Sequence, residues 1–245
     1  MSTKNTKKID VHMLWIGEKL SQLEVLAINS FSKNGFNVNL WQYQSIANTP
    51  KNAKQRDANQ ILPESAIFTY PNGSYAGFAN LFRYKLLSTE GGLWSDTDVV
   101  CLANSSLLTE TPFLASERSK EGKININCNV VYNPHPKKGD IIDLALGVAE
   151  RMDTSHQKWG ETGPKLLTML HRNYPNYTFR VMLPEACNPF NWWECPEVLL
   201  SKGITIPTTT KFLHCYNEMW RRKNVDKEAS YPAGSIMSEL ALKYL

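Results

Sequence analysis

The sequence lacks a hydrophobic segment suited to crossing or entering a membrane at its start. It opens with the polar, basic stretch MSTKNTKKID, and the apolar run that follows, Val11 to Gly17, is too short for a signal peptide or a membrane span. We therefore expect a cytoplasmic protein, either free or at the inner face of the membrane.

Cysteine is scarce and shows no paired spacing. An odd number of cysteines without the spacing of a zinc site or a small disulfide framework favours buried free thiols. The five cysteines are Cys101, Cys128, Cys187, Cys195 and Cys215.

Charge of one sign is also scarce. The formal net charge is only +4, and no run of lysine and arginine reaches the density of a nucleic-acid binder. We expect no nucleic-acid partner. The mild positive charge fits a phosphate-bearing small ligand or peripheral association with an anionic membrane surface.

The length and composition predict one domain over residues 1–245. A chain of 245 residues is near the upper end of what one hydrophobic core covers, and 42% of its residues are hydrophobic. There is no internal repeat and no low-complexity segment.

The first part of the chain predicts a βαβ unit. Residues Ile9–Ile16 form an apolar run that ends at Gly17, Leu20–Ser32 has helical spacing, and Phe36–Trp41 alternates like a strand. Such units build an α/β fold with a parallel sheet, which binds ligands at the carboxyl ends of its strands.

The next elements lead to two carboxylates. Lys51–Gln60 is polar and predicts a helix or a loop, while Phe78–Thr89 predicts a helix that stops at a glycine pair. Leu93–Leu102 then predicts a strand with two aspartates in its middle. Further along we expect a strand at Ile124–Tyr132, helices at Ile141–Met152 and Pro164–Asn173, and a loop at Phe190–Pro196.

Asp96 and Asp98 would point the same way from that strand, because alternate strand residues share a face. Two like charges at one place require a counter-ion, and a hard divalent ion such as Mn²⁺ or Mg²⁺ has the matching preference for oxygen ligands. Such an ion could bridge to a diphosphate. An Asp-x-Asp pair alone is weak evidence, so its surroundings matter.

Those surroundings resemble a known family. The stretch Asn80–Leu87 followed by Glu90–Val99 is similar to the sugar-binding region of glycosyltransferase family 32, and related patterns occur in clostridial glucosylating toxins. The match is close over residues 78–102. The resemblance implies a GT-A fold, a Rossmann-like, mixed and mostly parallel sheet flanked by helices.

The same resemblance implies roles for four residues. Asp98 would coordinate the metal, Asp96 would contact ribose or sugar hydroxyls and the metal shell, and Arg83 would contact the donor sugar or its phosphates. A helix-surface ion pair is the alternative for Arg83. Asn80 departs from the family, which usually has Asp there, so the sugar hydroxyls that it reads would differ.

A second resemblance lies in His12–Gly17, which is similar to the first strand of these families. There a tryptophan stacks on uracil, which implies that Trp15 binds the donor base. An indole offers a flat face and a glycine lets a base approach. Packing in the core is the alternative for Trp15.

Two later segments also resemble the family. Glu161–Leu167 is similar to a Thr-Gly-Pro segment before a helix; it would lie near the site, or Thr162 would only start the helix. Phe212–Arg222 is similar to the C-terminal segment that closes over the diphosphate. There His214 would bind the metal or a phosphate, with Glu218 as the rival ligand, and Trp220 would donate its N–H to a phosphate oxygen.

Two further pairs of residues each have two possible roles. Arg221 and Arg222 would assist the pyrophosphate or face solvent or lipid head groups. Trp192 and Trp193 would form a platform for an acceptor sugar or pack in the core.

Together these features predict a retaining, metal-dependent hexosyl- or N-acetylhexosaminyltransferase. The donor would be a nucleotide sugar, with UDP favoured, and the acceptor a hydroxyl of a glycan or lipid-linked glycan in bacterial surface polysaccharide synthesis. Residues 9–102 would bind the donor, and residues 103–245 the acceptor. The alternatives are a toxin-like effector that modifies a protein and a non-catalytic nucleotide-sugar-binding protein.

Overall fold

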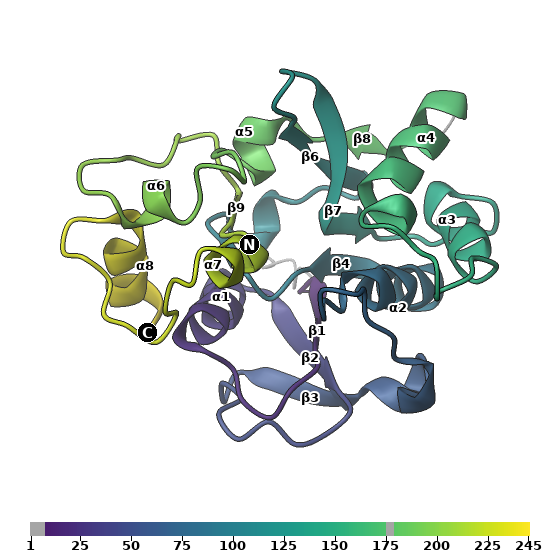
Figure 1. The fold of residues 1–245 in the computed structure, drawn as a ribbon, viewed down its shortest axis with the longest axis horizontal. Helices are drawn as coiled ribbons and strands as arrows, with labels where there is room; N and C mark the ends of the chain where they lie inside the picture. The colour runs from purple at the N-terminus through teal and green to yellow at the C-terminus, as the bar shows by residue number, and fades with distance from the viewer. Residues whose placement is uncertain (1–7, 175–178) are drawn as a thin grey trace, which may run out of the picture.

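The computed structural model describes residues 8–174 and 179–245 as a mixed α/β fold. A seven-stranded sheet forms its centre, and every strand in it runs parallel to the others except β7 (Figure 1). In spatial order the strands are β3 (Ala53–Asp57), β2 (Asn37–Gln42), β1 (Asp10–Trp15), β4 (Gly92–Ser95), β7 (Ile124–Asn133), β6 (Phe113–Arg118) and β8 (Arg180–Val181). The prediction of a mostly parallel sheet flanked by helices is confirmed.

A second, two-stranded antiparallel sheet pairs β5 (Val99–Cys101) with β9 (Phe212–His214). Its pairing joins the middle of the chain to the C-terminal part, which no local pattern in the sequence indicates. The helices are α1 (Gln22–Lys33), α2 (Ala76–Thr89), α3 (Ile141–Ala149), α4 (Leu166–Asn173), α5 (Pro184–Cys187), α6 (Glu197–Leu200), α7 (Asn217–Arg222) and α8 (Ile236–Tyr244).

Helices cover both faces of the large sheet. Neighbouring residues of β4 show this, since Trp94 packs with α2, α3 and α4 while Leu93 packs with α1 on the other face. Figure 1 shows the two groups of helices on opposite sides. A third cluster joins α1 to α6, α7 and α8 through side chains such as Leu26, Leu199 and Leu240. Alternation of side chains along each strand is what supplies both faces.

The predicted βαβ unit is confirmed by β1, α1 and β2, and the predicted helices at 78–89 and 141–152 correspond to α2 and α3. Gly91 and Gly92 end α2 with φ of 68° and 88°, in the left-handed region. A Cβ atom at Gly91 would lie 2.9 Å from the carbonyl oxygen of Asn133, so this turn requires glycine.

Lys51–Gln60 contains strand β3, followed by a short 3₁₀ helix at Ala58–Gln60, so the prediction of a helix or loop was wrong in part. β3 lies at the edge of the sheet and pairs in parallel with β2 alone. Its residues are mostly exposed, and backbone pairing rather than an apolar pattern therefore makes it a strand.

The predicted strand Leu93–Leu102 is two strands in different sheets. β4 ends at Ser95, and the N–H of Val99 donates to the carbonyl oxygen of Asp96 at 3.2 Å, which closes a turn over Asp96–Asp98. The two aspartates therefore lie in a turn and not in the middle of a strand. The pairing of β5 with β9 draws the chain away from the large sheet.

The cysteine prediction is confirmed, because all five cysteines are free and buried. Over residues 8–174 and 179–245, none of the helices combines the length and the apolar character needed to cross a bilayer.

Candidate functional site

Three side chains with metal-binding atoms meet at the turn after β4. The ligand atoms of Asp96, Asp98 and His214 all lie within 4.8 Å of one another. Within the described ranges, no other group of three or more His, Cys, Asp and Glu side chains meets this condition. Two of the residues are local in sequence, whereas His214 arrives because it pairs with Val99 across the small sheet.

Asp98 is held from the C-terminal segment. Its Oδ2 accepts the backbone N–H of Asn217 at 2.7 Å and lies 3.4 Å from Nε2 of His214. Its carbonyl accepts the N–H of Cys215 at 2.9 Å. Burial by itself would raise the pKa of Asp98, but His214 and the N–H of Asn217 outweigh it and lower the pKa.

A residue with left-handed backbone angles positions the N–H of Asn217. Tyr216 has φ 54° and ψ 61°, which is costly for a residue with a Cβ atom, and it stands between β9 and α7. The turn places the N–H of Asn217 against Asp98. Strain of this kind persists where the surrounding contacts enforce it.

Asp96 is held from α2 and β4 instead. Its Oδ1 accepts a guanidinium N–H of Arg83 at 2.7 Å and the indole N–H of Trp94 at 2.8 Å. Neither donor uses Oδ2, which is left for another partner. Burial raises the pKa of Asp96 and Asp98 raises it further, while Arg83 opposes both.

Arg83 is not a surface residue. It is only 3% exposed, it donates to the carbonyl of Cys128 at 2.5 Å, and its guanidinium lies 5.0 Å from the ring centre of Trp94. The alternative of a helix-surface ion pair is therefore excluded. A rigid Arg83 fixes the orientation of Asp96 and keeps a positive charge beside the cluster.

His214 is buried in contact with Asp98 and with a buried amide, since its Nδ1 lies 3.0 Å from Oδ1 of Asn188. Burial would lower the pKa of His214, but the carboxylates of Asp98, Asp96 and Glu117 together raise it.

Asn80 faces the Thr-Gly-Pro segment. Its Nδ2 donates to Oγ1 of Thr162 at 3.4 Å, and a Cβ atom at Gly163 would lie 2.8 Å from that nitrogen. Tyr84 binds the same segment, because its hydroxyl donates to the carbonyl of Thr162 at 2.8 Å. Asn80 and Arg83 are three residues apart on α2 and so are neighbours on one helix face.

Thr162 does not cap a helix. It lies in a π-helical turn, Glu161–Lys165, which contains a non-helical Gly163, and α4 begins only at Leu166. Thr162 is 1% exposed. The alternative that Thr162 only starts the helix is therefore wrong, because its side chain packs against α2 instead.

Trp15 stands at the carboxyl end of β1 and is only partly buried. Its indole N–H is buried without a hydrogen-bond partner, and Nζ of Lys227 lies 5.9 Å from the ring centre. Trp15 also packs against the core cluster around α1. Its contacts are therefore compatible both with packing in the core and with stacking on a base.

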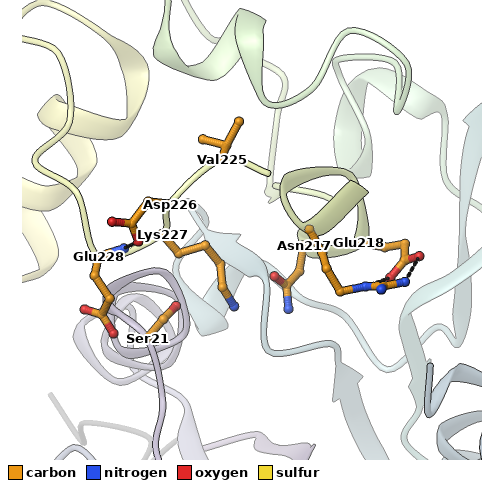
Figure 2. Close-up of a pocket in the computed structure, with 8 residues that line it drawn as sticks. Ser21, Asn217, Glu218, Val225, Asp226, Lys227 and Glu228 are labelled. Carbon is orange, nitrogen blue, oxygen red and sulfur yellow. Dashed lines mark hydrogen bonds and ion pairs between the residues drawn. The ribbon is translucent and has the colours of Figure 1, made fainter. Parts of the chain in front are cut away.

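A pocket of about 380 Å³ lies between the start of α1 and α7 with the loop that follows it (Figure 2). Figure 2 shows Lys227 between Ser21 and Asn217, so the pocket reaches the residue that binds Asp98. Its lining residues are Ser21, Asn217, Glu218, Arg221, Val225, Asp226, Lys227 and Glu228.

Two residues of the C-terminal segment do not join the cluster. Trp220 is fully buried, and its indole N–H donates to the carbonyl of Cys215 at 2.9 Å, so it has no N–H to offer a phosphate in this arrangement. Glu218 accepts from Arg221 at 2.7 Å and from Arg222 at 2.8 Å. These ion pairs occupy Glu218 and favour His214 as the third ligand.

The rings of Trp192 and Trp193 pack edge to face, with their centres 5.4 Å apart. Trp192 packs partly against the cluster of α6 and α8, with Nζ of Lys120 5.0 Å from its ring centre. The acceptor platform stays a prediction.

No motif in the sequence indicated the set of buried polar residues behind His214. Asn127 and Asn129 alternate along β7, Asn188 ends α5, and Asn127 donates to Oε2 of Glu117 at 2.6 Å. Burial raises the pKa of Glu117, against the opposing effect of His214. The one usable signal was asparagine at alternate positions of an otherwise apolar strand, where polar residues need a reason.

Comparison with known proteins agrees with this site. Residues 20–119 match the family model described as the glycosyltransferase sugar-binding region containing the DXD motif. The matched range includes α2, β4 and the Asp96–Asp98 turn. Residues 20–119 are therefore similar to the sugar-binding region of DXD glycosyltransferases. The narrower assignment to family 32 stays a prediction. No curated protein matched the chain.

Two solved structures of one glycosyltransferase share the fold. The apo form of the glycosyltransferase GlyE of Streptococcus pneumoniae TIGR4 aligns with a TM-score of 0.55 and 15% identity over 97% of this chain. A second GlyE structure gives 0.53 with 15% identity over 97% of this chain and 60% of its own. PaToxG glycosyltransferase gives 0.49, with 16% identity over 69% of this chain and 70% of its own. The chain spans 60% of apo GlyE, and at this identity GlyE shows only that the GT-A-like fold is shared.

Proposed function

We propose that this protein is a metal-dependent retaining glycosyltransferase that uses a nucleotide sugar, with UDP favoured, and transfers the sugar to a hydroxyl of a glycan or lipid-linked glycan. The observation that carries the proposal is the meeting of Asp96, Asp98 and His214 within 4.8 Å beside the buried Arg83. The turn after β4 supplies the two aspartates of this cluster, and the distant strand β9 supplies the histidine.

The residues fit a divalent ion. Two carboxylates are ligands that both Mn²⁺ and Mg²⁺ accept, and the imidazole in the set favours the transition metal, so we propose Mn²⁺. Asp96, Asp98 and His214 would hold it. When bound, the ion supplies positive charge against the diphosphate that departs in the reaction.

Other groups of the protein hold the two carboxylates in position for the ion. Arg83 keeps the Oδ1 side of Asp96 engaged, so that Oδ2 is the oxygen available to the ion. Asn217 holds Asp98 in the same way through its backbone N–H. Positions fixed before the reaction cost no reorganisation during it, which is the main benefit of such preorganised charge.

The donor would occupy the space between the cluster and the carboxyl end of β1. Trp15 would stack on the base, and Lys227, which lies over the Trp15 ring and lines the pocket beside Asn217, would lie within reach of its ribose or phosphates. Asn80 and Arg83, on α2, would face the sugar.

For transfer with retention, the acceptor oxygen would attack the anomeric carbon from the side that the diphosphate leaves. The new carbon–oxygen bond forms as the bond to the phosphate oxygen breaks, and that leaving oxygen takes the acceptor proton. No side chain is assigned as nucleophile or base.

The test is a screen of UDP- and GDP-sugars for slow donor hydrolysis with Mn²⁺, which needs no acceptor. Hydrolysis of a UDP-sugar that disappears in EDTA and returns with added Mn²⁺ is the expected result. Binding of the nucleotide sugar without any hydrolysis would instead identify a non-catalytic binding protein. Labelling of proteins in an extract would identify an effector that modifies protein.

A further inference from the structure

A buried amide lies directly behind the cluster. Asn188, the residue that ends α5, is 1% exposed, and its Nδ2 donates to the carbonyl oxygen of Ser116 at 2.9 Å. Three groups surround its Oδ1: Nδ1 of His214 at 3.0 Å, Nδ2 of Asn129 at 3.0 Å and the hydroxyl of Tyr216 at 3.3 Å.

The carbonyl of Ser116 decides which way this amide points. A carbonyl oxygen can only accept, so the NH₂ group of Asn188 must face Ser116 and its oxygen must face His214. Asn129 is compatible with this orientation, because its NH₂ group donates to that oxygen at 3.0 Å and its own oxygen accepts from Nδ2 of Asn188 at 3.4 Å. An oxygen that faces Nδ1 can only accept, and Nδ1 of His214 must therefore carry the proton.

We propose that Asn188 is a positioning residue, which keeps the proton of His214 on Nδ1 so that Nε2 is free to bind the metal ion. The inference rests on the proposed function, because it assigns His214 as the third ligand. Nε2 is the nitrogen on the side of Asp98, at 3.4 Å from its Oδ2. Asn188 contacts the imidazole from behind.

A neutral amide suits this position. The groups that face the imidazole already include the carboxylates of Asp98, Asp96 and Glu117 and the ring of Tyr216, whose centre is 3.9 Å from that of His214. Asn188 orients the ring without adding another negative charge. Partners behind a metal-binding histidine typically change metal affinity by about 10–100-fold when removed.

The first experiment reads the tautomer of the metal-free wild-type protein. The nitrogen-15 NMR signals of histidine-labelled protein are recorded as the pH is raised until the imidazole of His214 is neutral. The signals of His214 are identified by their absence in His214→Gln. We expect the remaining proton on Nδ1. A proton on Nε2 would overturn the proposal, and this reading requires no variant of Asn188 to fold.

The second experiment measures binding of Mn²⁺ alone by titration calorimetry. Asn188→Ala should weaken binding roughly 10–100-fold, because the imidazole then loses the acceptor for its Nδ1 proton. The matched control is Asn133→Ala, which removes a buried amide at the C-terminal end of β7, away from the cluster, that donates to Asp140. Equal affinities for Asn188→Ala and the control would overturn the proposal.

The two levels of inference fail in different ways. A wild-type protein that binds no Mn²⁺ and hydrolyses no donor would sink the proposed function. A wild-type protein that does both, with the His214 proton on Nε2, would sink only the role of Asn188.

Discussion

The two aspartates of the cluster lie one residue apart in sequence and are held by different parts of the molecule. Asp96 depends on Arg83 and Trp94, which are both close to it in sequence, and its side chain is 31% exposed. Asp98 depends on His214 and Asn217, and its side chain is 11% exposed. One half of the site is therefore local and the other is assembled by the small sheet.

This difference separates what each half does. Under the proposed function, the local half, made of α2, β4 and the start of the turn, would present Asn80, Arg83 and Asp96 to a sugar, and we expect changes there to alter which donor is used. The assembled half would complete the ligand set, and we expect changes there to remove metal binding.

The largest effect should come from the assembled half. Asp98→Ala should lower Mn²⁺-dependent donor hydrolysis by roughly 10³-fold or more, because the charge of the departing diphosphate then lacks its support. Initial rates of hydrolysis measure this. Asp153→Ala, at an exposed aspartate, is the control and should be unchanged. Full wild-type activity in EDTA would contradict the prediction.

A buried histidine away from the cluster, His12, sharpens the comparison. His12, in β1, accepts the indole N–H of Trp41 on Nδ1 at 3.1 Å, and burial lowers its pKa to about 4. The unfolded chain therefore takes up a proton on His12 between about pH 6.5 and 4 that the folded chain does not, so stability falls as the pH falls through this window. The loss is at most about 3 kcal/mol.

His12→Gln keeps an acceptor for Trp41 and has no charge to gain, so its stability should depend less on pH than that of the wild type. Urea unfolding at several pH values between 4 and 7 measures the difference in slope. Parallel slopes would show that His12 is not the group that titrates.

In the local half, Asn80→Asp should change the preference among donor sugars. An ionised Asp only accepts, whereas Asn also donates, so a sugar group satisfied by the amide N–H would lose its partner at a cost of about 1–3 kcal/mol. The expected shift in relative efficiency is roughly ten- to a hundred-fold, with the metal requirement intact. A panel of nucleotide sugars compared by hydrolysis decides it, and identical ratios would refute a sugar-reading role.

An effect of the same size is expected where the donor base would bind. Trp15→Ala should weaken donor binding by about 1–3 kcal/mol, the scale of one aromatic stack on a base, with little change in Mn²⁺ affinity. Trp220→Phe is the matched contrast, because Trp220 is fully buried in the core and its indole N–H donates to the carbonyl of Cys215. It should lower stability without changing donor affinity. An unchanged donor dissociation constant for Trp15→Ala would assign Trp15 to the core.

The local half of the candidate site could be predicted well from the sequence, and the other half only in part. The motif around Asp96 was found because α2 and β4 are adjacent in the chain, although the two aspartates were expected in a strand and lie in a turn. His214 was named as a ligand through a resemblance. Asn188 was not found, because no spacing in the sequence relates the residue after α5 to β9.

The sequence by itself determined the pattern of apolar residues that makes β1, α1, β2 and α2, the glycine pair that ends α2, and the identity of Asp96 and Asp98. These are local properties, which depend on neighbours a few residues apart. Only the tertiary structure decided that β5 pairs with β9, that Asn217 and His214 meet Asp98, and that Trp220 faces the core instead of the site. Strand pairing over long separations is set by the burial of whole faces, and no short stretch of sequence contains that information.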